Sequence, residues 1–421
     1  MKKIVTSLFL LTILYSFGQN NLRINLDESG TTYIKAAIRA NFWARYYQTN
    51  PGSTINGEEV NHISDVSIRR LRMNFESQIT PKLFFYSNLG INNVNLTTQR
   101  NVSLSILDMY IEYTLVPEFA LGIGQIGWGS SRGTMRSSKS MMGLDTPLFS
   151  LFNVNKNDHY GRNLGVFAKG YIGKKWSYVA TIKNPVKITT TPKEKIVDYA
   201  NNAPRKQYSG YLKYDFLDRE SNKNSYSGGA GTYIGTKKIC NIAIGGVYQS
   251  KMMSELDNNQ LKYYDYTNFS SEFFLDIPIS EKNNAITAYL GYFHTDFGRN
   301  YVRKLGANDI ADTEGGSSFN GNGNDVPMMG SGNTLFFQGG YLFPKSEKYD
   351  LRIQPNVSIQ HSKFYGLKNA TNIYDIGVNI FFKGHDRKLS LSYQNRPIYD
   401  MNTEVFSRKG MVVLQFQVEI N

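Results

Sequence analysis

The chain has 421 residues, of which 41% are hydrophobic and 14% are aromatic, and its formal net charge is +13. Past the N-terminal region, no stretch comes near the ~20 consecutive apolar residues that a transmembrane helix needs, which excludes a helical membrane protein. The only cysteine, Cys240, cannot form a disulfide within the chain. We expect Cys240 to be a passive strand residue.

The N-terminal residues have the three parts of a secretory signal peptide. Lys2 and Lys3 supply the positive charge, residues 4–15 form the apolar run, and Ser16 and Gly18 are small residues suited to cleavage. We therefore predict a signal peptide over 1–18 and a single exported domain over 19–421.

Beyond this segment, apolar and polar side chains alternate in stretches of about ten residues or more. In the first stretch, Ile34, Ile38 and Phe42 fall on one face, and Arg39 and Arg45 fall on the other. A period of two predicts β-strands with two different faces. About sixteen such strands are expected, over 32–48, 65–79, 82–95, 102–115, 119–127, 163–172, 176–184, 208–217, 238–250, 264–278, 284–296, 334–343, 350–363, 371–383, 387–396 and 409–420.

The connections between these strands alternate short and long along most of the chain. This asymmetry, an even strand number and one apolar face per strand are typical of a transmembrane antiparallel β-barrel around water. The fold class predicted is therefore all-β. The high Tyr and Phe content suits the aromatic girdles of such barrels. One connection fits badly: residues 218–237 should form a short turn, but they are long and Gly-rich. They either extend the next strand or contain a hairpin that the pattern misses.

Three apparent motifs do not support an enzyme. Gly122–Gly127 matches the dinucleotide fingerprint, but it lies within a strand and no helix follows. Its glycines are expected to leave room for a loop packed inside the barrel. Gly129–Gly133 matches the nucleophile-elbow pattern without the required strand–turn–helix context. His294 and Asp296 share a strand face and could serve a protease at the rim, but a wet lumen position is favoured. We expect no catalysis, cofactor or metal.

The long segment 128–162 is the best functional candidate. It is too long for an ordinary connection, and its apolar residues, Phe152 among them, give it contacts of its own. Folded into the lumen, it would narrow the channel. Its basic side chains exceed the acidic Asp145 and Asp158, and they are Arg132, Arg136, Lys139, Lys156 and Arg162.

A second basic set is expected to face the lumen from the first two strands, as a ladder of Lys35, Arg39, Arg45, Arg70 and Arg72. Basic side chains that line a constriction favour anions and phosphates. The open alternative is that the ladder pairs with Glu76, Asp108 and Glu112 and merely braces the wall.

Several stretches also resemble the phosphate-selective porins O and P family. They are "SIRRLRMNFESQITPKLFFYSNLG" (67–90), "LGIGQIGWG" (121–129), "GRNLGVFAKGYI" (161–172) and "GTYIGTKKICNIAIGGVYQ" (231–249). The resemblance implies a sixteen-stranded, typically trimeric outer-membrane pore with a basic lining and a loop folded into the lumen. The segment after the fifth strand occupies the place of that loop.

The primary hypothesis is therefore a passive porin of the bacterial outer membrane that favours small anions. The exported chain is expected to keep a net charge of about +11, which favours anionic solutes or lipopolysaccharide over nucleic acid as partners. The alternative is that the basic residues are scattered over the surface and bind no anionic partner. The alternative function is a barrel closed by its loops that serves as a structural or secretion-complex subunit.

Overall fold

The computed structural model describes residues 22–97, 102–145, 147–151, 161–185, 188, 190–203, 205–281, 284–310, 320–346 and 348–421. The predicted signal peptide and three residues predicted in the long segment, Phe152, Lys156 and Asp158, lie outside the described residues. Within these ranges, no helix is long and apolar enough to cross a membrane.

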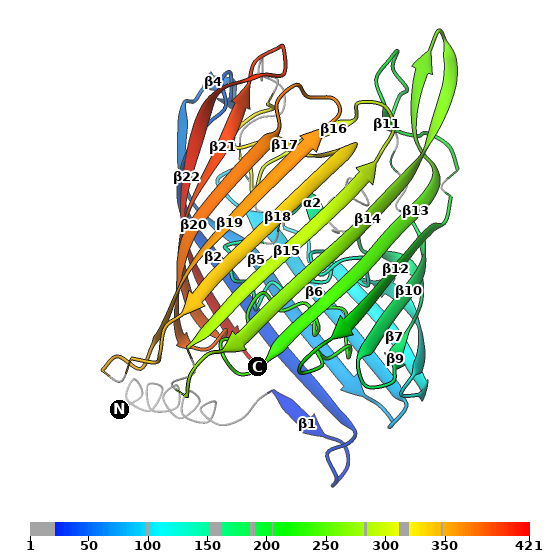
Figure 1. Ribbon diagram of the computed structural model, residues 1–421, viewed down its shortest axis with the longest axis vertical. Coiled ribbons are helices and arrows are strands. Elements are labelled where there is room, and N and C mark those ends of the chain that lie inside the picture. Colours follow the sequence, from blue (N-terminus) through cyan, green and yellow to red (C-terminus); the bar gives the residue numbers. More distant parts are fainter. Residues whose placement is uncertain are drawn as a thin grey trace, which may run out of the picture.

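The described strands form a closed antiparallel barrel of sixteen strands, so the predicted fold class is confirmed (Figure 1). Strand β2 (Tyr33–Gln48) pairs with both β5 (His62–Gln78) and β22 (Val405–Ile420), and these pairings close the ring. The other barrel strands are β6 (Leu83–Val94), β7 (Ser105–Val116), β8 (Phe119–Ile126), β9 (Asn163–Ile172), β10 (Trp176–Asn184), β12 (Gln207–Asp215), β13 (Ile239–Asp257), β14 (Gln260–Pro278), β15 (Ala285–Asp296), β18 (Gly332–Leu342), β19 (Arg352–Phe364), β20 (Thr371–Lys383) and β21 (Arg387–Tyr399).

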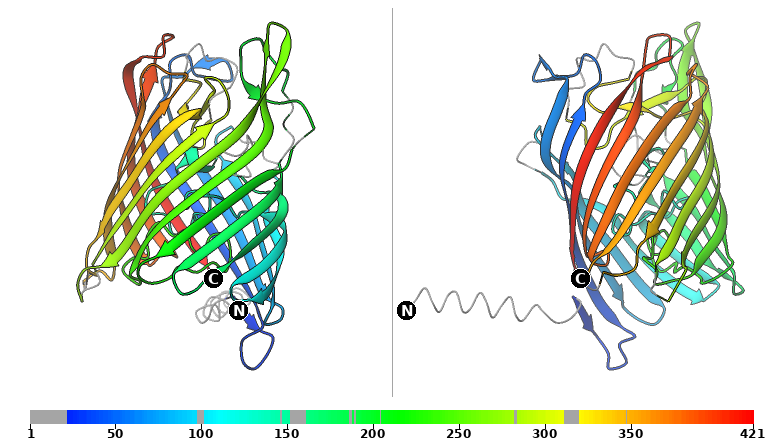
Figure 2. Two further views of the ribbon diagram at one scale, coloured as in Figure 1. Left: turned by 45° about the vertical axis from the view of Figure 1, so that its right-hand side comes forward. Right: turned by 60° about the vertical axis from the view of Figure 1, so that its left-hand side comes forward.

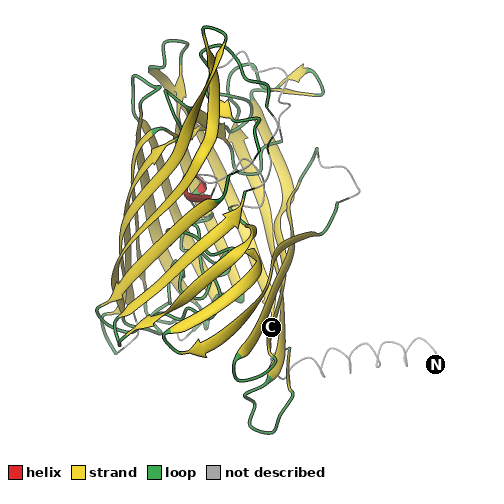
Figure 3. Cartoon of the chain, turned by 90° about the vertical axis from the view of Figure 1, so that its right-hand side faces the viewer, coloured by secondary structure: helices red, strands yellow, loops and turns green. Residues whose placement is uncertain are grey.

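The remaining elements are short. They are β1 (Arg23–Asn25), β3 (Thr54–Ile55), β4 (Glu58–Glu59), β11 (Asp198–Tyr199), β16 (Val302–Leu305), β17 (Val326–Gly330) and the helix α2 (Leu148–Leu151), which lies inside the barrel (Figure 3). The predicted strand limits differ most from the structure at β13 and β14, which run together as a long hairpin above the rest of the wall (Figure 2). On β13 the alternation of exposed and buried side chains is lost over Met252–Glu255, whereas backbone pairing with β14 continues to Asp257.

The alternating pattern separates the two faces of the wall as predicted. On β2, Ile38 and Phe42 are 39% and 40% exposed, whereas Arg39 and Asn41 between them are 6% and 0% exposed. Apolar side chains therefore face outward and polar ones face a filled lumen. An arginine facing lipid at the bilayer midplane would cost ~2–4 kcal/mol, which explains why this register is fixed.

A β-bulge in β5 changes the phase of this alternation. Asn41 on β2 pairs with Arg70 and Phe42 pairs with Ile68, so Arg69 is the extra residue. Arg69 and Arg70 are both buried on the lumen side. A strict period of two places Arg69 on the lipid face, so the sequence analysis missed it.

Two sequence-based expectations are wrong. Residues 218–237 neither extend β13 nor contain a hairpin; this connection enters the lumen, where Glu220 binds Arg132. Figure 3 shows that loops fill the inside of the barrel. His294 and Asp296 do not face the lumen, because the inward positions of β15 are taken by Phe293 and Thr295. The Nδ1 atom of His294 lies 2.9 Å from Oδ1 of Asn333 on the neighbouring strand.

Substitution of Leu414 by Arg tests the two-faced wall. Leu414 is outward-facing and lies well inside the apolar band of β22, whereas Phe406 faces outward near the rim. We expect Leu414→Arg to lower the free energy of unfolding by ~2–4 kcal/mol and Phe406→Arg by ~0–1 kcal/mol. Urea unfolding of the barrel in lipid vesicles measures both values. Equal costs at the two positions would contradict the assignment of the lipid-facing side.

Candidate functional site

Two segments enter the lumen from opposite ends and meet there. The upper segment, which comprises the described residues 127–145, 147–151 and 161–162 between β8 and β9, comes from the end opposite the C-terminus. The lower segment, 216–238 between β12 and β13, comes from the other end (Figures 1 and 3). The Arg132 guanidinium of the upper segment donates to Glu220 of the lower segment at 2.5 Å and to the carbonyl of Ala230 at 2.8 Å. Both side chains of this ion pair are 1% exposed or less. The pair joins the two segments in the middle of the barrel.

Glu220 is the centre of this junction. Its carboxylate also accepts hydrogen bonds from Lys213 at 2.8 Å, from the Tyr233 hydroxyl at 2.6 Å and from Asn241 at 2.9 Å. Burial alone would raise the pKa of Glu220, but the charges of Arg132 and Lys213 outweigh it and lower that pKa to about 2. Glu220 therefore stays ionised throughout the physiological pH range.

Glycine allows the two segments to approach each other closely. The amides of Gly231 and Thr232 donate to the carbonyl of Ser140 at 2.9 and 3.2 Å. A Cβ atom on Gly229 would lie 2.3 Å from the carbonyl oxygen of Met135, which no side chain tolerates. The Gly-rich composition of 218–237 was the one sequence signal for this contact.

A second junction ties both segments to the wall. Asp108 on β7 accepts from Arg162, at the end of the upper segment, at 3.1 Å and from the Tyr226 hydroxyl of the lower segment at 2.8 Å. Nε of Arg162 also donates to the Tyr226 hydroxyl at 2.8 Å. At Gly127 a Cβ would lie 2.3 Å from that hydroxyl, so this glycine leaves room for an inner segment. The expectation that Gly122 and Gly124 do so is wrong, because the wall itself fills the space: the ring of Phe167 at Gly122 and the backbone of Met109 and Tyr110 at Gly124.

Between the joined segments and strands β2, β5 and β6 lies a cavity of about 250 Å³. We call it the basic cavity. It is far larger than the ~10–15 Å³ that one water needs. Among the described residues that line it, Glu76 and Glu419 are acidic and seven are basic. The basic ones are Lys35, Arg39, Arg70, Arg72, Arg136, Lys139 and Arg162, all of them predicted from the sequence to line the passage.

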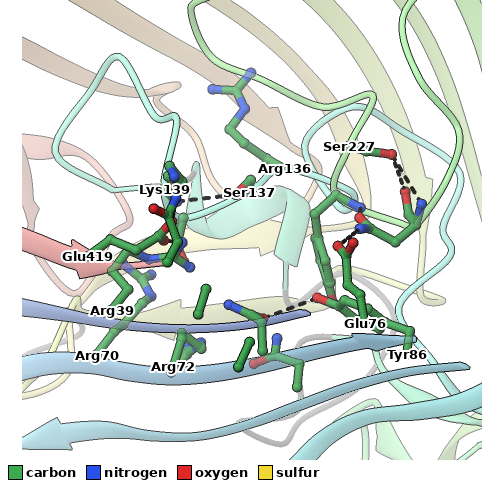
Figure 4. Close-up of a pocket in the computed structure, with 18 of the residues that line it drawn as sticks. Arg39, Arg70, Arg72, Glu76, Tyr86, Arg136, Ser137, Lys139, Ser227 and Glu419 are labelled. Carbon is green, nitrogen blue, oxygen red and sulfur yellow. Dashed lines mark hydrogen bonds and ion pairs between the residues drawn. The ribbon is translucent and has the colours of Figure 1, made fainter. Parts of the chain in front are cut away.

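Figure 4 shows Arg39, Arg70 and Arg72 on the wall side of the basic cavity, with Lys139 and Arg136 on the upper segment across from them. Arg39 pairs with Glu419 at 2.8 Å, and Lys139 pairs with the same carboxylate and with Asp386 at 2.7 Å. These carboxylates lie on the last strand and on the β20–β21 turn, far along the chain. Sequence alone did not identify them as partners.

Other cationic groups of the basic cavity are held by neutral oxygens. Arg72 donates to Oδ1 of Asn92 at 2.6 Å and to the carbonyls of Leu71 and Ile91 at 2.7 and 3.0 Å. Arg136 donates one bond, to Gln338 at 3.0 Å, and its Nε and second terminal nitrogen have no partner among the described residues. Burial lowers the pKa of Arg136, but an arginine remains charged at neutral pH. Arg136 is therefore a buried positive charge with hydrogen-bond donors to spare.

Glu76, Asp108 and Glu112, the possible partners of the basic ladder on the first two strands, form their ion pairs with other residues. Glu76 contacts Lys223 at 3.3 Å, Asp108 contacts Arg162 and Glu112 contacts Lys169 at 2.8 Å. The cation partners of Glu76 and Glu112 therefore come from the lower segment and from β9. The wall ladder is braced by Glu419 and Asp145 instead.

Asp145 binds two arginines of β5, of which Arg70 lines the basic cavity. Its carboxylate accepts Nε and Nη2 of Arg69 at 2.9 and 2.6 Å and also pairs with Arg70. Beyond it lies a second cavity of about 80 Å³, lined by Asp145 and Gln338 among others. The contacts Arg70–Asp145 and Arg136–Gln338 each join a residue of the basic cavity to a residue of the second one. We call these two contacts the septum.

Two of the predicted residues lie away from the basic cavity. Arg132 is committed to the junction with Glu220 and stacks 3.6 Å from the centre of the Phe274 ring. Arg45 pairs with Asp65 at 2.5 Å and donates to carbonyls of Ala307 and Asn308, in the loop between β15 and β18. Their predicted role in an anion path is therefore not supported by proximity.

Comparison with known proteins agrees with this architecture. The family model described as "Phosphate-selective porin O and P" matches residues 37–235, just under half of the chain, which confirms the predicted resemblance. No protein with a curated description matches the chain.

Solved structures share the fold at very low identity. The anion-selective porin from Comamonas acidovorans is 8% identical with a TM-score of 0.53, over 92% of this chain and 99% of that one. OprB of Pseudomonas putida is 7% identical with a TM-score of 0.55, over 92% and 94%. The outer membrane channel DcaP of Acinetobacter baumannii is 11% identical with a TM-score of 0.50, over 92% and 97%. The chain is thus a β-barrel of the bacterial outer membrane with the architecture of a channel.

Substitution of Glu220 by Gln tests the junction of the two inner segments. Breaking a buried ion pair on one side costs ~3–5 kcal/mol, so we expect the amides of Gly231 and Thr232 to exchange with solvent much faster. Because the folded-state pKa is lowered, the wild-type junction is at full strength above about pH 4.5 and weakens as the pH falls through about 2. Hydrogen exchange, corrected for intrinsic rates, measures both effects.

The matched control is Glu76→Gln. Glu76 also binds the lower segment, through Lys223 and Asn224, but its ion pair is partly exposed and expected to contribute only ~0–1 kcal/mol. Equal acceleration in the two variants, or unchanged protection in Glu220→Gln, would contradict the role given to Glu220.

Proposed function

We propose that this outer-membrane barrel is a porin through which small anions, phosphate among them, diffuse passively along the basic cavity. The observation that supports it is the charge of that cavity, with seven basic lining side chains against two acidic ones. No nucleophile or cofactor is needed, because the driving force is the concentration gradient and the protein supplies a path and a potential.

The physical basis of the proposed selectivity is a fixed positive potential in a confined space. Low-dielectric walls focus the field of the lining charges, which raises the local concentration of anions and lowers that of cations. Arginine offers planar pairs of N–H donors that match phosphate oxygens, whereas lysine acts as a point charge. Arg136, which pairs with no carboxylate among the described residues, would contribute most to that potential, and Arg39 and Arg70 less because carboxylates offset them.

A second candidate function is favoured by a specific observation. The upper and lower segments meet in the lumen, and the septum separates the two cavities. A barrel held in this state would conduct poorly and would serve as a structural or secretion-complex subunit. The two candidates differ in whether the purified barrel carries current.

The remaining proposals concern processing and assembly. We propose that residues 1–18 are removed on export, that 19–421 form the mature barrel and that the barrel assembles as a homotrimer. Outer-membrane lipid and lipopolysaccharide are the proposed surroundings of its apolar face, and nucleic acid is not a proposed partner. The basic excess of the chain supports anionic partners.

Substitution of Arg136 by Gln tests the anion preference. It removes a charge that pairs with no carboxylate in the described part of the chain, so it leaves no orphaned acid behind. For wild type we expect an anion-selective reversal potential in a planar bilayer with a KCl gradient. For Arg136→Gln we expect the chloride-to-potassium permeability ratio to fall by about tenfold, the effect of one unit charge at short range. Lys82→Gln, in an exposed turn, should change nothing. A cation-selective wild type would end the proposal.

Substitution of Asp145 by Asn decides between an open and an occluded barrel. The variant weakens the septum by removing the charge that holds Arg69 and Arg70, so its single-channel conductance should exceed that of wild type. A silent wild type and a conducting variant would favour the occluded barrel. Asp386→Asn is the control, because Asp386 pairs with Lys139 of the basic cavity but not at the septum. Unchanged conductance in Asp145→Asn would show that the septum does not limit flow.

A further inference from the structure

A belt of polar and basic side chains crosses the outer face of the barrel at the end of the long loops. It lies at the upper ends of β19 to β22 (Figure 2, right). On each of these strands the outward side chains change from apolar to polar: after Ile359 on β19, above Tyr374 on β20, after Tyr393 on β21 and above Val412 on β22. The outward residues that follow are His361, Lys363, Asn372, Asn395 and Arg408. Exposed aromatic side chains, Tyr365 and Phe406, follow only beyond this belt, at the rim.

Arg408 is fixed in this belt by its neighbours. Its Nε donates to Oδ1 of Asn395, and one terminal nitrogen donates to the carbonyls of Asn372 and Asn395 at 2.7 and 3.1 Å. The guanidinium lies 5.0 Å from the centre of the Tyr374 ring. Its other terminal nitrogen has no partner among the described residues. The cation is therefore oriented, with donors left for a ligand outside the wall.

Two further groups stand beside Arg408. Nδ1 of His361 lies 2.7 Å from Oδ1 of Asn372, the residue whose carbonyl accepts from Arg408. Lys363 follows two residues after His361 on the same face, and it is exposed and forms no hydrogen bond or ion pair with the described residues. Across the next strand, Lys363 pairs in register with Asn333, which binds His294. Arg408 and His361 thus both contact Asn372, and Lys363 lies two residues beyond His361 on the same face of β19.

On the β13–β14 hairpin, by contrast, an acidic side chain stands beside the basic ones. The outward Asp265 accepts hydrogen bonds from Tyr248, Ser250 and the amide of Lys251. Asp265 offsets the positive charge on that side. The belt on β19 to β22 contains no carboxylate of its own among the outward residues named above.

We propose that this belt binds the phosphate groups of a phosphorylated glycolipid in the outer leaflet of the outer membrane. The apolar band below Arg408, Lys363 and His361 would hold the acyl chains, and the three side chains would meet the headgroup. A fixed guanidinium with free donors suits phosphate oxygens, and basic residues at a lipid interface attract anionic headgroups. The belt lies at the loop-bearing end, which faces the outer leaflet.

The test uses the full-length folded barrel and native mass spectrometry. The probes are bisphosphorylated lipid A, the same lipid A after phosphatase treatment, and phosphatidylglycerol. For wild type we expect lipid A to bind more tightly than either other lipid. In the double variant Arg408→Gln/Lys363→Gln, we expect affinity for lipid A to fall by about fivefold for each basic side chain removed. Heat-modified migration in SDS gels checks that each variant is folded.

Arg387→Gln is the matched control, because Arg387 is an exposed basic residue at the opposite end of β21. Its affinity for lipid A should equal that of wild type. Equal binding of dephosphorylated and bisphosphorylated lipid A would overturn the proposal. So would an equal loss of affinity in Arg387→Gln, or full affinity in the double variant. None of these readouts depends on whether the lumen conducts ions.

Discussion

The pairing of β2 with β22 is the constraint on which the rest of the structure depends. In hydrocarbon a strand edge cannot bond to water, so the sheet must close on itself. Closure places half of the side chains in lipid and half in a lumen, and the register of every strand must keep charge on the inner side. The lumen then holds many polar groups that need partners, and the upper and lower segments supply them.

The lumen is therefore an electrostatic assembly rather than an empty tube. Glu220 forms ion pairs with Arg132 and Lys213, and Glu419 forms ion pairs with Arg39 and Lys139. Asp386 and Glu419 together offset Lys139 and Arg39, so the surplus of positive charge in the basic cavity comes from its other basic side chains. The same shared pairs hold the inner segments in place, so stability and selectivity depend on the same side chains. A solute that competes for these arginines would also loosen the segments that they hold.

The fold could be predicted from the sequence because alternation is a local signal: the predicted limits of β9, β10 and β20 match the structure. The same signal predicted Lys35, Arg39, Arg70 and Arg72, four of the seven basic residues that line the basic cavity, and the length and charge of the segment after β8 predicted the other three. The rest required information that no local pattern carries. The partners Asp145 and Glu419 are set by where a loop folds and by how the ring closes. The path of the lower segment depends on contacts made across the lumen. Its glycine content was the one sequence feature that indicated a close contact there.

The bulge at Arg69 shows that the number of residues in a strand, as well as their type, determines which charges face the lumen. One additional residue in β5 turns two consecutive arginines to the same side, and both converge on Asp145. The amino-acid composition of the strand does not determine this arrangement. The number of residues that precede the bulge determines which side chains face the lumen. Insertions and deletions of single residues in wall strands are thus a route by which barrels of this architecture can change their inner charge without exchanging any amino acid for another.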